Sequence, residues 1–420
     1  MTLWTTVALD LVGFGIVVPI LGRYAERFGA NGLQVGLLFA SFSLAQLVCA
    51  PLLGRLSDRI GRKPVIVISL IGTAVGSLVT GAANSLWLLF AGRIIDGASG
   101  GSLSVAQAAV ADISSPEQRP KLVGMMGAAF GVGFVLGPAI GGLSALGGPH
   151  VPFYVAAALA AANAIAAMVR LPETRHVDHR KSVGIASSAK STGVANAHMS
   201  VDQTEPSDAS VTTGTSAAAG AGSSLGHLPK SKVLRRLALV GFITTFAFAA
   251  FEATFSLFGK RRFDLDEGSA AAVFLGVGLV LVAIQGGLYG RIVERWGVGR
   301  VFRNGLVLVV AGLLVLAAAT TWPVLIVALL LLSVGQGCAS PSITAIVTEL
   351  APHDQRGEAL GFQQSAYAVA RVIGPPIAGL LFDHAGVPSP YLAGAALCLV
   401  GVTLVVVWGL HRVVPVAAVH

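Results

Sequence analysis

Charged residues are scarce in this sequence. Asp, Glu, Lys and Arg make up 11% of the 420 residues, whereas hydrophobic residues make up 54%. A soluble domain carries roughly a quarter charged residues. One water-soluble core of this length cannot hide so much apolar surface, so lipid must cover part of it. The composition therefore excludes an ordinary soluble protein and predicts a membrane protein.

Sequence signals for ATP, metals and disulfides are also missing. There is no G-x-x-x-x-G-K-[ST] loop, so we do not expect ATP to drive the activity, and neither H-E-x-x-H nor Cys-x-x-Cys occurs. The three cysteines, Cys49, Cys338 and Cys398, lie inside apolar runs and are predicted to be small buried residues. We predict a protein that is not an enzyme and has no cofactor, metal site or disulfide framework.

Long apolar runs fill most of the chain. A helix needs roughly 20 apolar residues to cross a bilayer. The expected spans are 3–21, 33–53, 65–83, 87–111, 122–145, 151–171, 234–258, 269–289, 302–320, 323–348, 359–382 and 390–411. The predicted fold is an all-α membrane protein with twelve transmembrane helices in two pseudo-symmetric six-helix halves.

The composition changes abruptly in the middle of the chain. Residues 175–232 are rich in Ser, Ala, Gly, Thr and His and contain no apolar run. Such a segment is predicted to be a flexible linker. The expected organisation is an N-terminal six-helix half at 1–174, this linker, a C-terminal half at 233–412 and a tail at 413–420. No signal peptide is predicted before the first span.

The basic residues indicate the topology. If the amino terminus and the linker are cytoplasmic, most of the 28 Lys and Arg residues lie inside. Those left outside are Arg23, Arg27, Lys260, Arg261 and Arg262. The net charge of +8 is then a topology signal, and no nucleic-acid partner is expected. We predict a multi-pass protein of the inner or plasma membrane with both termini cytoplasmic.

A short charged segment, residues 54–63, separates two uncharged spans. Gly54 and Gly61 would let the helix ends turn closely, and Asp58 lies among cations, where it suits a charge-assisted contact with a neighbouring helix end or with Arg119. In the simpler interpretation the cations only set topology and contact anionic lipid. The candidate residues of this charged cytoplasmic turn are Gly54, Asp58, Arg59, Gly61, Arg62, Lys63 and Arg119.

The two halves repeat parts of each other. Residues 290–297 are a degraded copy of the charged segment. In addition, the pattern at 112–119 and 137–142 returns with the same internal spacing at 349–356 and 374–379. Parallel halves with a substrate path at their interface are one known transporter architecture. The repeat itself indicates duplication, not transport.

Ionisable residues inside the spans are the candidates for function, because they are costly in lipid and usually face a cavity or a partner. They are Asp10, Arg93, Asp96, Glu252 and Arg371. Asp10 has no local cation, which suits a group that takes up and releases a proton. Arg93 and Asp96 lie one turn apart, where the simpler interpretation is mutual neutralisation.

Glu252 has aromatic neighbours at helical spacing. Phe248 at i−4 and Phe255 at i+3 would share its face, so the group could hold a proton, or a lipophilic cation through charge and cation–π attraction. The alternative is that Glu252 pairs with Arg371 purely for folding.

The fifth span carries a stripe of glycines. Small residues let helices approach closely in lipid, so the stripe predicts tight packing, alone or combined with a hinge at the proline. Its residues are Gly133, Gly137, Pro138, Gly141 and Gly142.

Five of these segments, in this order, resemble motifs of the major facilitator superfamily, and within it the twelve-span drug:proton antiporters that include the tetracycline-efflux type. The resemblance covers both halves without the linker. The segments are 9–21 in span one, the basic loop 54–63, 93–101 in span four, 127–142 in span five and 171–174 after span six. Asp96 departs from the pattern, which often has glutamine there.

The resemblance implies a role for Arg93 in proton coupling, for the basic loop in gating, and for the span-five motif in antiport. We therefore expect a monomeric, proton-coupled antiporter in the lipid bilayer, which exports small amphipathic compounds or drugs by alternating access. Two alternatives stay open: an uptake symporter for a small metabolite, and a non-transporting receptor or scaffold on the same fold.

Overall fold

The computed structural model describes residues 2–113, 119–171, 173, 231–352 and 355–410, and all regular secondary structure in these ranges is helical. The backbone of a membrane span must satisfy its own hydrogen bonds, which a helix does within one segment. The N-terminal half contains α1 (Thr2–Glu26), α2 (Gly32–Ile60), α3 (Arg62–Gly81), α4 (Leu86–Ser99), α5 (Ser102–Ile113), α6 (Arg119–Ala145) and α7 (Val151–Arg170).

The C-terminal half repeats this pattern. It contains α10 (Lys232–Phe263), α11 (Glu267–Ala283), the π-helical turn η2 (Ile284–Leu288), α12 (Tyr289–Trp296), α13 (Val298–Ala318), α14 (Trp322–Leu350), α15 (Arg356–His384) and α16 (Ser389–Val407). Ten helices of the described chain are long and apolar enough to cross a membrane. The two other predicted spans correspond to α4 with α5 and to α6, so the expected all-helical membrane fold is confirmed. The predicted linker 175–232 and tail 413–420 lie almost entirely outside the described residues.

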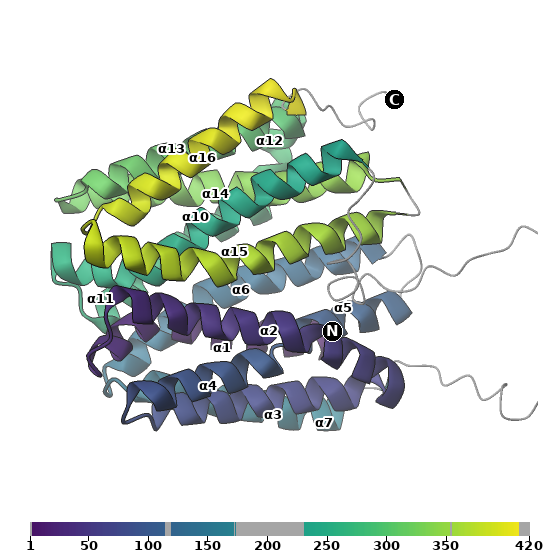
Figure 1. The fold of residues 1–420 in the computed structure, drawn as a ribbon. Coiled ribbons are helices and arrows are strands. Elements are labelled where there is room, and N and C mark those ends of the chain that lie inside the picture. The colour runs from purple at the N-terminus through teal and green to yellow at the C-terminus, as the bar shows by residue number, and fades with distance from the viewer. Residues whose placement is uncertain (1, 114–118, 172, 174–230, 353–354, 411–420) are drawn as a thin grey trace, which may run out of the picture.

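The two halves lie side by side, and the start of α1 and the end of α16 lie toward the same end of the bundle (Figure 1). We call this the terminal end; it carries Thr2, Gly61, Leu171, Gly297 and Val407. The opposite end, here the loop end, carries the connections 27–31, 82–85, 146–150, 264–266, 319–321 and 385–388. The halves meet where α2 packs on α15, α6 on α11, and α1 on α10 and α11.

The basic loop is shorter than the sequence suggested. Helix α2 continues to Ile60 and α3 begins at Arg62, so only Gly61 separates them. Its φ of +106° favours glycine, and Gly297 forms the same one-residue turn between α12 and α13 with a φ of +78°. Gly54 lies inside α2 and not at the turn, because the helix extends beyond the apolar run.

The predicted fourth span is not one continuous helix. It divides into α4 and α5 at Gly100 and Gly101, where the amide of Gly101 bonds to the carbonyl of Ser99 instead of continuing the α-helical pattern. Two adjacent glycines remove the side chains that would otherwise restrict the backbone. The break brings polar groups of three helices together, as described below.

Candidate functional site

Asp10 lies at the break in span four. Its side chain on α1 is half-buried and accepts a hydrogen bond from the hydroxyl of Ser102, the first residue of α5. The carbonyl that the break frees, that of Gly100, accepts a hydrogen bond of 3.0 Å from the amide of Gln46 on α2. The broken span therefore brings a carboxylate, a hydroxyl and an amide together within the membrane-spanning part of one half.

Arg93 and Asp96 form a buried ion pair on α4. Arg93 Nη1 lies 2.8 Å from Asp96 Oδ2, so the pairing that the sequence left open is present. Asp96 also accepts a side-chain hydrogen bond from Thr73, and the Arg93 guanidinium lies 4.3 Å from the centre of the Phe42 ring. Arg93 Nε is buried without a hydrogen-bond partner. The pair thus leaves part of the guanidinium's donor capacity unused.

Asp10 and Asp96 are close enough to repel each other electrostatically. Within the described residues Asp96 has Arg93 as its ion-pair partner, and Asp10 has no ion pair. The cluster therefore contains two acids and one cation, the cation being held by the second acid. An excess carboxylate in a membrane span is stabilised by taking up a proton.

The charged residues of the C-terminal half are arranged more loosely. Glu252 on α10 is half-buried and attracts the exposed Arg371 on α15, but in the described structure the two make no ion pair within 4.0 Å. Near Arg371, the amide of Gln363 donates a hydrogen bond to the hydroxyl of Tyr367. Arg371 interacts through space with both Glu252 and Tyr367, and this places a cation near polar groups where α10 packs on α15.

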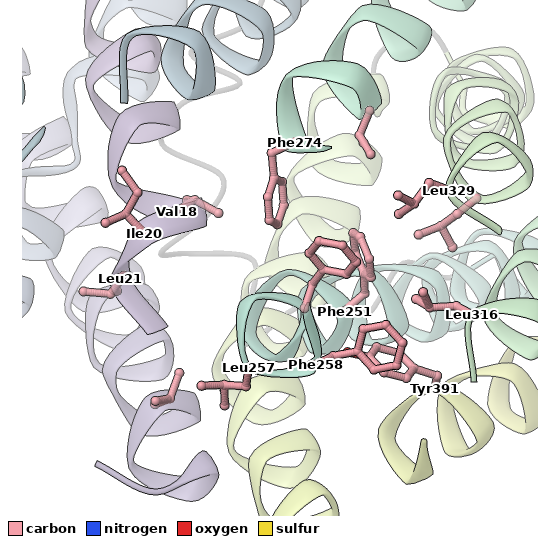
Figure 2. Close-up of a cluster of buried hydrophobic side chains, with 14 of the residues drawn as sticks. Val18, Ile20, Leu21, Phe251, Leu257, Phe258, Phe274, Leu316, Leu329 and Tyr391 are labelled. Carbon is pink, nitrogen blue, oxygen red and sulfur yellow. The ribbon is translucent and has the colours of Figure 1, made fainter. Parts of the chain in front are cut away.

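The two phenylalanines expected beside Glu252 lie in different surroundings. Phe255 is fully buried, with its ring centre 5.2 Å from that of Phe251 and 5.4 Å from that of Phe274, whereas Phe248 is partly buried against Phe251. Figure 2 shows the neighbouring rings of Phe251, Phe258 and Phe274 gathered in this hydrophobic cluster. Helical spacing did not reveal that the ring of Phe255 packs in the core, and a role of Phe255 beside Glu252 stays a prediction.

Arg62 organises the charged segment at the terminal end. Its guanidinium lies 2.5 Å from Asp58 and 2.9 Å from Asp112, and it donates a 2.6 Å hydrogen bond to the Ser57 hydroxyl. These contacts join the end of α2, the start of α3 and the end of α5. Asp58 therefore pairs within its own half in this state. The side chain of Arg119, its other expected partner, is outside the described part of the structure.

Glu173, which follows span six, caps α3. Its carboxylate accepts hydrogen bonds from the amides of Arg62 at 2.9 Å and Lys63 at 3.2 Å. A carboxylate suits the start of a helix because the first amides have no partner inside the helix. In the sequence, Glu173 belongs only to the short motif 171–174. Its position four spans away from the basic loop gave no signal of the contact.

The span-five glycines pack α6 against α1. A side chain at Gly137 would place its Cβ 2.5 Å from the Cα of Gly15, and one at Gly133 would lie 2.7 Å from the backbone of Leu11. Gly141 packs on Ile16, while Gly142 faces Ala271 across the halves. The close packing follows directly from the absent side chains. A hinge at Pro138 stays a prediction.

A membrane-facing groove of about 580 Å³ lies apart from these residues. It opens between α2, α4 and α15 near the loop end, and none of the predicted coupling residues lines it. Its lining residues are Gln34, Leu37, Ala40, Ser41, Leu44, Leu86, Trp87, Phe90, Val372 and Pro376. Within the described chain no group of three or more His, Cys, Asp or Glu residues is placed to hold a metal ion.

Two repeated six-helix halves, with acidic and basic side chains inside their spans, define a multi-pass membrane transport protein. The sequence matches the family model described as Major Facilitator Superfamily over residues 3–300 and 280–418. The chain belongs to the Major Facilitator Superfamily, whose members are transporters and not enzymes.

Several characterised proteins are similar over nearly the whole chain. The Escherichia coli tetracycline resistance protein, class E, is 32% identical over 89% of this chain and 85% of its own length. Multidrug resistance protein 2 of Bacillus subtilis is 26% identical over 97% of this chain and 94% of its own length. The crystal structure of the human organic anion transporter MFSD10 (TETRAN) superposes with a TM-score of 0.68 at 27% identity, covering 96% of this chain and 98% of that one.

Proposed function

We propose that this protein is a proton-coupled antiporter that exports small amphipathic compounds or drugs by alternating access. The observation that carries the proposal is Asp10, an acid without an ion pair in the described structure, bonded to Ser102 at the break in span four. The similarity to tetracycline and multidrug resistance proteins supports export of such compounds.

The proposed coupling follows from the balance of charge in the cluster. Ionised Asp10 accepts a hydrogen bond from the Ser102 hydroxyl. Protonated Asp10 is neutral and therefore needs no cation beside it. A substrate that binds better to the ionised form of Asp10 then excludes a proton from Asp10, and the proton excludes the substrate. This mutual exclusion is the requirement for antiport. Arg93, with its unused Nε, is the residue proposed to respond to the charge on Asp10.

Glu252 is the second carboxylate proposed to hold a proton or a cationic substrate. It lies in the other half, and its attraction to Arg371 is not closed into an ion pair. A substrate between the halves would thus meet one carboxylate from each. The alternative role in folding predicts that Glu252→Gln lowers stability and leaves the substrate range unchanged.

The orientation proposed is a cytoplasmic terminal end in an inner or plasma membrane. The cations at the α2–α3 turn, including Arg55, Arg59, Arg62 and Lys63, lie at this end, as the positive-inside rule requires. With that orientation the loop end, where α2 packs on α15, faces the outside. We also propose that residues 1–174 and 233–412 form the two halves. The basic loop gates the cytoplasmic side, and the protein is a monomer.

The test uses purified protein in liposomes that contain a pH-sensitive dye. An imposed proton gradient is challenged with a panel of dyes and antibiotics for the wild type, Asp10→Asn and the control Asp264→Asn. Asp264 is an exposed residue with a φ of +51°, a conformation that asparagine also tolerates.

We expect substrate-driven proton movement in the opposite direction for the wild type and for Asp264→Asn, and its loss in Asp10→Asn. Proton and substrate moving in the same direction would identify a symporter instead. Proton exchange that persists in Asp10→Asn would remove Asp10 from the coupling step.

A further inference from the structure

Asp383 caps a helix of the opposite half. Its two carboxylate oxygens, near the end of α15, accept hydrogen bonds of 2.9 Å each from the amides of Gly32 and Leu33. These are the first two residues of α2, whose amides have no partner inside the helix. A carboxylate there gains from both charge-assisted hydrogen bonds and the helix dipole. The C-terminal half therefore supplies a cap to the N-terminal half.

Close backbone contact between α2 and α15 allows this reach. A Cβ at Gly32 would lie 2.9 Å from the carbonyl oxygen of Gly379, and one at Gly36 would lie 2.8 Å from the Cα of Pro376. The two helices thus meet through positions without side chains. We call this contact, formed by Gly32, Gly36, Pro375, Pro376 and Gly379, the loop-end seam.

Helix α2 does not depend on Asp383 for its own start. The side chain of Asn31 accepts a 2.9 Å hydrogen bond from the amide of Gln34, and Gln34 in turn accepts one from the amide of Asn31. This reciprocal cap lies within one half and survives when the halves separate. Separation would leave only the amides of Gly32 and Leu33 at the start of α2 without this cap, so the Asp383 contact can break without unfolding α2.

A second polar contact across the loop end is longer. Lys260 Nζ on α10 lies 3.7 Å from Glu26 Oε2 on α1, and Arg23 Nη1 lies 3.6 Å from the same oxygen. Lys260 is about half-exposed, so solvent weakens this attraction. The Asp383 cap is the shorter and more directional of the two.

We propose that Asp383 is a positioning residue of the transport cycle, whose cap on α2 holds the loop end closed and whose release lets the halves separate there. The inference rests on the proposed alternating-access function and adds the residue that sets the balance between its closed and open states. Asp383 contacts neither Asp10 nor Glu252, so it acts through the position of α2 and not on the substrate.

The test measures the distance between the halves with spin labels on full-length protein in lipid nanodiscs. The labels are attached through Asn84→Cys and Thr320→Cys, two exposed loop-end positions in opposite halves, after replacement of Cys49, Cys338 and Cys398. Asp383→Asn keeps the shape of the side chain, but its NH₂ group cannot accept a hydrogen bond, so one of the amides of Gly32 and Leu33 loses its acceptor. Pulsed spin-resonance distances then report the ratio of open to closed molecules.

The matched control is Asp266→Asn. Asp266 caps α11 through a 2.7 Å hydrogen bond from the amide of Ser269, the same type of contact at the same end, but to an amide of its own half. Its attraction to Arg23 of α1, across the halves, is weaker than this cap. We expect Asp383→Asn to raise the open-to-closed ratio about 5- to 10-fold and Asp266→Asn to leave it unchanged. Thermal unfolding of both variants checks that they remain folded.

Gly32→Ala approaches the same contact from the other side. Its added Cβ would lie 2.7 Å from Asp383 Oδ1, so it should shift the ratio in the same direction without changing Asp383. An unchanged distance in Asp383→Asn, or an equal shift in Asp266→Asn, would overturn the proposal. Because the Cβ in Gly32→Ala also lies 2.9 Å from the carbonyl oxygen of Gly379, its shift reports the seam as a whole. The spin-label measurement needs neither substrate nor a proton gradient. Its result for Asp383 is therefore independent of whether Asp10→Asn abolishes proton exchange.

Discussion

The two ends of the molecule are built differently. At the loop end the buried hydrophobic residues form one cluster that includes both halves, with Leu21 of α1, Phe251 and Leu257 of α10 and Phe274 of α11 among its members (Figure 2). At the terminal end the described residues form separate clusters. One is made by α1, α3, α5, α6 and α7, and another by α10 and α13 to α16.

This difference shows where the molecule is free to change. A shared core must be pulled apart for the loop end to open, and close packing makes such an interface switch between discrete states. Separate cores at the terminal end let each half keep its packing in either state. The two halves are therefore expected to move as bodies, with the seam of α2 and α15 as the contact that is made and broken.

The largest effect is expected from filling that seam. Gly36→Val adds a branched side chain at a position where even a Cβ alone would lie 2.6 Å from the carbonyl carbon of Pro375. Overpacking of about 3 kcal/mol, on the order of 100-fold, should favour the open loop end. The spin-label distances measure this, with Gly276→Val as control because a Cβ there meets no atom within 4 Å. An unshifted distance in Gly36→Val would show that the seam is not close-packed.

A smaller effect is expected from the polar cluster at the terminal end. Arg62→Ala leaves Asp58 and Asp112 without their cation, but these side chains are 48% and 35% exposed, so water replaces much of the interaction. We expect a loss of about 1 kcal/mol of unfolding free energy. Thermal unfolding compared with Arg55→Ala, an exposed cation in the last turns of α2, measures it. An equal loss in both variants would contradict a stabilising role for the Arg62 contacts.

The cap at Asp266 gives a pH-dependent effect that is smaller still. Hydrogen bonds from the hydroxyl and amide of Ser269 lower the pKa of the Asp266 carboxyl. A lowered folded-state pKa means that the contribution is present above the unfolded value of about 4 and disappears as pH falls through the folded value. The melting-temperature difference between wild type and Asp266→Asn should thus shrink between about pH 5 and pH 3. A constant difference would contradict this cap.

No effect is expected from the segment between the halves. Its composition predicts a passive connection, and the segment lies outside the described residues. Deletion of residues 180–228 should leave both transport and the loop-end distance unchanged. Loss of transport in a deletion variant that still inserts normally would show that the segment takes part in function.

The sequence predicted the architecture well, because apolar run length and the positions of Gly and Pro act locally. It missed the division of span four at Gly100 and Gly101, since adjacent glycines do not always break a helix: Gly141 and Gly142 lie inside the continuous α6. It also missed Glu173 and Asp383, whose partners lie far along the chain. Single carboxylates at helix ends give no sequence signal of the helix that they cap. Asp10 was found because an acid in an apolar run is conspicuous, whereas its partner Ser102 is not.

The one-residue turn at Gly61 has a mechanical consequence. Only Gly61 connects α2 and α3, and Glu173 accepts hydrogen bonds from the first amides of α3, so the connection between the two helices is short and held in place. Any tilt of α2 is therefore transmitted to α3, and through Arg62 to α5, at whose start Ser102 holds Asp10. Helix α2 therefore connects the loop-end seam to the contacts that hold α3 and α5 at the terminal end.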